Sequence, residues 1–131
     1  MTAAARYAYV ILAWLFLALL VVQVFLAGLG IFATARSFAL HVDLGYVLHL
    51  APILVLLAAA LSRAGRRHWA WALGLAVVVF FVPVMVYFRD AMPEVSALHP
   101  VLAMVAFGLA AMVARNSVHA LRMARAEPPA A

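Results

Sequence analysis

The sequence contains no cysteine and no lysine, and charged residues make up only 10% of its 131 residues. The absence of cysteine excludes disulfides, thiolate metal ligands and thiol nucleophiles. Every basic residue is therefore an arginine, and the formal net charge is +5. On so apolar a chain, this positive charge indicates contact with anionic lipid and a fixed membrane topology, and we expect no nucleic-acid partner.

Apolar residues dominate the chain. They account for 71% of it, with a mean hydropathy of +1.18, whereas soluble domains are roughly 45–50% apolar. Four blocks contain no arginine and approach or exceed the roughly 20 residues that a membrane-spanning helix needs: 8–33, 40–61, 69–88 and 98–114. Because an isolated strand cannot satisfy its backbone in lipid, the sequence predicts an all-α, integral membrane four-helix bundle. We expect one domain, residues 1–131, with a tail at 115–131.

The arginines predict the orientation of this bundle. Short loops rich in arginine stay in the cytoplasm. Seven arginines flank one side of the four blocks and two flank the other: Arg6, Arg63, Arg66, Arg67, Arg115, Arg122 and Arg125 against Arg36 and Arg89. We therefore expect both termini in the cytoplasm and a multi-pass protein of the bacterial inner (plasma) membrane. The first block is too long for a signal-peptide core, so we interpret it as a span.

Few polar side chains lie inside the blocks, and the histidines are the most informative. His41, Gly45 and His49 are spaced four residues apart, so they share one face of the second span. His99 opens the fourth span, which begins on the same side of the membrane as the second. His41 and His99 are thus predicted at similar depth, where two imidazoles are a normal axial pair for haem and Gly45 would leave room for the porphyrin. The alternative is that both are interfacial residues beside ordinary small-residue packing faces.

His49 lies near the middle of its span and needs a polar partner, because an unpaired polar group there costs several kcal/mol. Gln23 of the first span is a strongly polar side chain at comparable depth. Two interpretations stand: an interhelical hydrogen bond between His49 and Gln23, or a ligand or proton-relay role for His49.

Two resemblances follow from these motifs. The arrangement His41-x-x-x-Gly45-Tyr46 resembles the His-x-x-x-Gly element of b-type membrane cytochromes, which implies His41 as one haem ligand and His99 as the opposite one. With QVFLAGLGIF in the first span and ALHP opening the fourth, the whole chain also resembles a small uncharacterised family of four-helix bacterial membrane proteins. This second resemblance implies no activity.

The leading hypothesis is therefore an electron carrier that holds one haem b between the second and fourth spans. His41 and His99 would bind the iron, with Gly45, His49 and Gln23 supporting the site. The alternative is a non-catalytic accessory or assembly protein whose histidines and glutamine only lock helix packing. Neither hypothesis implies catalysis by the chain itself, and the sequence identifies the bilayer but no redox or subunit partner. A transporter is disfavoured because no inverted repeat is evident.

Overall fold

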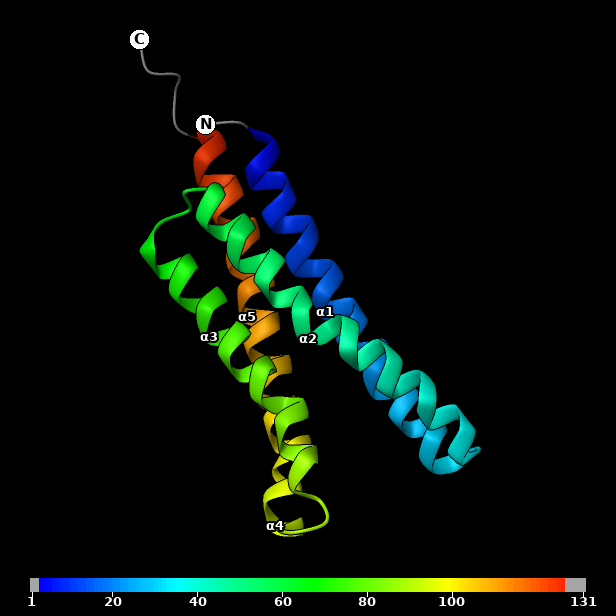
Figure 1. Cartoon of the computed structure of the whole chain (residues 1–131). Helices are drawn as coiled ribbons and strands as arrows, with labels where there is room; N and C mark the ends of the chain where they lie inside the picture. The colour runs from blue at the N-terminus through cyan, green and yellow to red at the C-terminus, as the bar shows by residue number, and fades with distance from the viewer. Residues whose placement is uncertain (1–2, 127–131) are drawn as a thin grey trace.

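A computed structural model of the protein describes residues 3–126 and consists of helices joined by short turns (Figure 1). The long helices are α1 (Ala3–Phe32), α2 (Phe38–Leu61), α3 (Arg66–Val84) and α5 (Leu98–Ala126). Each belongs to a segment long and apolar enough to cross a membrane. Three short elements join them: η1 (Ala35–Ser37), η2 (Met85–Phe88) and α4 (Pro93–Ser96). The predicted all-α class and the four candidate spans are confirmed.

The long helices form two antiparallel pairs, α1 with α2 and α3 with α5. The pairs also contact each other through α1 with α5 and α2 with α3. In Figure 1 they lie side by side where α1 begins and α5 ends, and they diverge toward the opposite end. The bundle is therefore closed at one end and splayed at the other.

The buried residues are also found toward the closed end of the bundle. The buried core consists mainly of small and branched side chains: Tyr9, Ala13, Phe16, Leu48, Val55, Ala58, Ala59, Ala72, Leu75, Val79, Ala106, Ala110, Val113 and Ala114. No residue of 17–47 or 80–105 is buried. We call these two ranges the far half and the remaining described residues the termini half. Because all buried residues lie in the termini half, the packing of the bundle is concentrated there. Many of them are alanines, and small residues let helix backbones approach closely in a membrane.

All four long helices extend beyond their predicted spans at one end, and two of them extend furthest. α1 begins at Ala3 rather than near residue 8, and α5 continues to Ala126 rather than ending near residue 114. Lipid solvates only part of such a helix, and charged side chains can extend it into the interface. Hydropathy therefore identified the four long helices but not their ends. The rest of the predicted tail, 127–131, lies outside the described residues.

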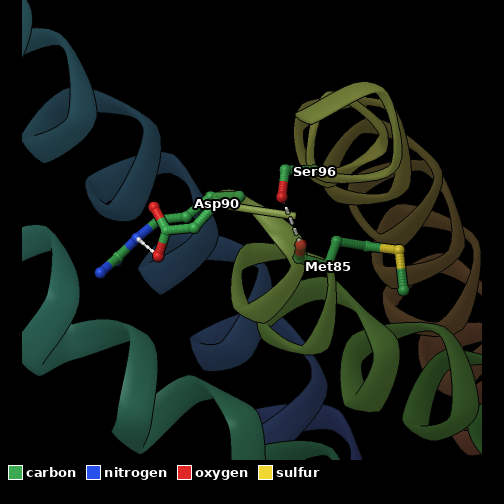
Figure 2. A network of polar contacts seen from close by, with 4 residues as sticks. Met85, Asp90 and Ser96 are labelled. Carbon is green, nitrogen blue, oxygen red and sulfur yellow. Dashed lines mark hydrogen bonds and ion pairs between the residues drawn. The ribbon is translucent and has the colours of Figure 1, made fainter. Parts of the chain in front are cut away.

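The turns that join the helices differ in construction. Between α2 and α3, Arg63 and Gly65 both have positive φ angles, 48° and 101°. Between α3 and α5, the Ser96 hydroxyl donates a hydrogen bond of 2.7 Å to the carbonyl of Met85, and Arg89 pairs with Asp90 at 3.6 Å (Figure 2). Both partners of this ion pair are largely exposed, so it adds little stability.

Candidate functional site

His41 and Gln23 join α1 to α2 through two reciprocal hydrogen bonds. The Gln23 amide nitrogen donates to the His41 carbonyl at 2.7 Å, and His41 Nδ1 lies 3.0 Å from the Gln23 carbonyl oxygen. Because a carbonyl oxygen only accepts, Nδ1 of His41 must carry the proton. In the neutral imidazole this leaves the lone pair of Nε2 free.

His99 is held in the same way within the other helix pair. Its Nδ1 lies 2.8 Å from the carbonyl oxygen of Val82 in α3, so Nδ1 is again the donor. Val82 is among the last four residues of α3, whose carbonyls have no partner within a regular α-helix. The end of α3 thus supplies the acceptor that orients the His99 ring.

The two imidazoles meet between the helix pairs. Their ring centres are 6.4 Å apart and their planes are inclined at 69°. The Phe38 ring covers His41 at 5.0 Å between centres. The predicted approach of His41 and His99 is therefore present, and both residues lie in the splayed far half, where the side chains are partly exposed.

Gly45 does not form the predicted slot for a flat ligand. A Cβ atom on Gly45 would lie 3.1 Å from the amide nitrogen of Gln23. The missing side chain therefore makes room for Gln23 to reach the His41 carbonyl, one helical turn away. On α5, Ala106 and Ala110 follow His99 at helical spacing, but both belong to the buried core and leave no slot for a flat ligand there either.

The predicted hydrogen bond between His49 and Gln23 is not formed. Gln23 is engaged with His41 instead, and the buried Nδ1 of His49 has no hydrogen-bond partner among the residues that the structure describes. The His49 ring packs against Phe80 of α3, with centres 5.4 Å apart. The ligand or relay interpretation of His49 stays a prediction, because nothing in the structure tests it.

The chemistry of this site is limited to two imidazoles. Within residues 3–126, no group of three or more histidine, aspartate or glutamate side chains could hold a metal ion. A typical structural or catalytic zinc site, with three or four protein ligands, is therefore not present in this range. A metal held by two axial imidazoles and a macrocycle needs only two protein ligands, and that is the number of imidazoles that meet here.

Sequence reasoning did not identify two contributors to the site. Phe38 carries no signal that distinguishes it from other aromatic residues near a membrane interface. The Val82 carbonyl is a backbone group, so no residue type marks it, although Pro83 next to it indicates an irregular helix end.

Comparison with known proteins gives one match. The model of a family described as "Family of unknown function (DUF6220)" matches residues 23–88. The matched range contains Gln23, His41, Gly45 and His49 but not His99. No curated protein and no solved structure matches the chain, and the resemblance to b-type cytochromes finds no support in these comparisons. Since the match covers about half of the 131 residues, the chain belongs to the DUF6220 family.

Proposed function

We propose that the protein is a membrane electron carrier that binds one haem b in the far half of the bundle, where His41 of α2 and His99 of α5 would hold the iron. The haem would supply one-electron redox chemistry, and the chain would supply the ligands, their orientation and an apolar surrounding.

The observation that carries the proposal is the distance between the two rings. Imidazole nitrogen binds a first-row metal at about 2.0–2.1 Å, so two rings on opposite sides of one metal have centres roughly 6 Å apart. The ring centres of His41 and His99 are 6.4 Å apart. The distance between the centres of these two rings, on different helix pairs, is therefore close to the one that a shared iron would need.

The hydrogen bonds of the two histidines give further support. Metal-binding histidines commonly donate their second ring N–H to a backbone carbonyl, which fixes the tautomer and the ring orientation. His41 and His99 both do this, through Gln23 and Val82. With Nδ1 engaged in this way, Nε2 of each ring is the nitrogen that would bind a metal.

The packing of the far half is also consistent with a bound group. No residue of the far half is buried, although the same helices pack closely in the termini half. In Figure 1 the helix pairs diverge on this side. A porphyrin between them would cover apolar side chains that the protein alone leaves uncovered.

A structural role is the second candidate, and the same hydrogen bonds favour it. The Gln23–His41 contacts join α1 to α2, and the His99–Val82 contact joins α3 to α5. An accessory or assembly protein would need these contacts only to lock its helix pairs.

Visible spectroscopy separates the two candidates. We expect the full chain, purified in detergent from haem-replete cells, to show a Soret band that shifts on reduction, with about one haem per chain. His41→Ala and His99→Ala should each lose this band, because one axial ligand is removed. His119→Ala, which changes a histidine in the termini half, should retain it. A folded but colourless wild-type protein would refute haem binding and support the structural role.

A further inference from the structure

A basic pocket lies in the termini half, away from the histidine pair. It has a volume of about 410 Å³ and is bounded by the first turns of α1, the turn between α2 and α3, and the last turns of α5. Three arginines line it, one from each of α1, the turn and α3: Arg6, Arg63 and Arg67. His68 and His119 complete its basic lining.

Tyr9 is a buried donor in the lining of this pocket. Its side chain is only 1% exposed, and its hydroxyl is buried without a hydrogen-bond partner among the described residues. The Nδ1 atom of His68 is also buried and unpartnered in that range, and the two rings meet edge to face at 6.3 Å. Burying such groups without partners is costly, and a ligand with acceptor oxygens in the pocket would reduce this cost.

No carboxylate side chain of the described residues lies in the same half of the bundle as these basic residues. Within residues 3–126, the carboxylate side chains are Asp43, Asp90 and Glu94, and all three belong to the far half. The first turn of α3 contains no acidic residue and its N-terminus has no side-chain cap. Arginine is unfavourable at the positive end of a helix, so Arg67 and the free helix end both favour an anion at this place.

We infer that this pocket binds a phosphate group, with the Tyr9 hydroxyl and the guanidinium of Arg67 as donors. Phosphate presents several strong acceptor oxygens and a negative charge, which match a buried hydroxyl in a pocket lined by arginines. The same group could belong to the headgroup of an anionic phospholipid or to a free phosphate. The inference does not depend on haem, because the pocket shares no residue with the histidine pair.

Lipid binding and phosphate binding can be measured separately on the full chain. In the first arm, native mass spectrometry counts phosphatidylglycerol and phosphatidylcholine molecules retained by the protein. In the second arm, inorganic phosphate is titrated into the detergent-solubilised protein and followed by calorimetry. Retention of phosphatidylglycerol alone identifies a lipid headgroup, and saturable phosphate binding identifies a free phosphate.

Three variants test the pocket itself. Tyr9→Phe removes only the unpartnered hydroxyl, and Arg67→Gln removes one lining charge; each should weaken binding about tenfold, as expected for a lost hydrogen bond to a charged group. Arg66→Gln is the matched control, because Arg66 precedes Arg67 but does not line the pocket, and it should change binding less than twofold. Circular dichroism checks that each variant is folded.

Three results would overturn the inference. The first is the absence of binding in both arms. The second is an equal loss for Arg66→Gln and Arg67→Gln, which would mean diffuse surface charge. The third is unchanged binding by folded Tyr9→Phe, because the buried hydroxyl would then not contact the ligand.

Discussion

Gly30, near the end of α1, controls the position of the ring that covers His41. A Cβ atom at Gly30 would lie 2.9 Å from both Cβ and Cγ of Phe38 and closer still to Cδ2. The Cβ of Phe38 is tied to the backbone of α2 and cannot move aside easily. Phe38 in turn stacks on His41, so one missing methyl group in α1 allows the observed placement of an imidazole in α2.

We expect Gly30→Ala to destabilise the protein by about 1–3 kcal/mol, as overpacking does elsewhere. It should also displace Phe38 and weaken any haem band. Thermal unfolding in detergent, followed by circular dichroism, measures the loss of stability. Gly28→Ala is the control, because a Cβ there meets nothing within 4 Å, and it should be neutral or slightly stabilising. Equal effects of the two substitutions would contradict this account of Gly30.

The sequence predicted which polar residues matter better than it predicted their partners. His41, His99 and Gln23 stand out because intramembrane polar groups are rare. Matching Gln23 to His49 by depth was wrong, because depth does not report the rotation of one helix against its neighbour. The true partners of Gln23 and His99 include backbone carbonyls, which no residue type reveals.

At the scale of the helix, α5 presents a packed face and an open face. Ala110 is 1% exposed and belongs to the core, whereas a Cβ at Gly108 would meet nothing within 4 Å. The helices of the termini half approach closely because alanines line their contacts. The spacing of small residues in the fourth span therefore serves helix packing.

Ala110→Leu should be strongly destabilising, by at least about 1–3 kcal/mol, because no space exists for the added carbons. Gly108→Leu inserts a larger side chain only two residues away, on the open face, and should be tolerated. Unfolding of the two variants in mixed micelles compares their free energies of unfolding. A similar loss for both would show that α5 is not packed as described.

Helix number and type were predictable because each span must satisfy its own backbone in lipid. Helix length was less predictable. The last turns of α5 carry Arg115, Arg122 and Arg125, which lower hydropathy without ending the helix. The divergence of the two pairs had no signal in the sequence, because hydropathy alone does not distinguish apolar residues that face lipid from those that face another helix.

At the scale of the whole molecule, charge separates the two ends of the bundle. The arginines near the start of α1, around the α2–α3 turn and in the last turns of α5 contrast with the acidic residues of the far half. By the positive-inside rule, this asymmetry favours an orientation with the termini half facing the cytoplasm.

The absence of cysteine makes this orientation directly measurable. We expect Asp90→Cys, at a side chain 89% exposed in the far half, to react with a membrane-impermeant maleimide added to intact cells. Arg122→Cys, at the exposed end of α5, should react only after the cells are permeabilised. The wild-type chain has no thiol and gives the background. The reverse pattern of labelling would place the termini half outside.

Arg63 occupies a position where the backbone of the turn favours glycine and the basic pocket favours a positively charged side chain. Its φ angle of 48° is left-handed, a conformation that costs a residue with a side chain roughly 1–2 kcal/mol and costs glycine almost nothing. A glycine here would relax the end of α2, but it would also remove one of the guanidinium groups that line the basic pocket. With arginine at this position, the turn is less stable than it would be with glycine, and the pocket has one more positive charge.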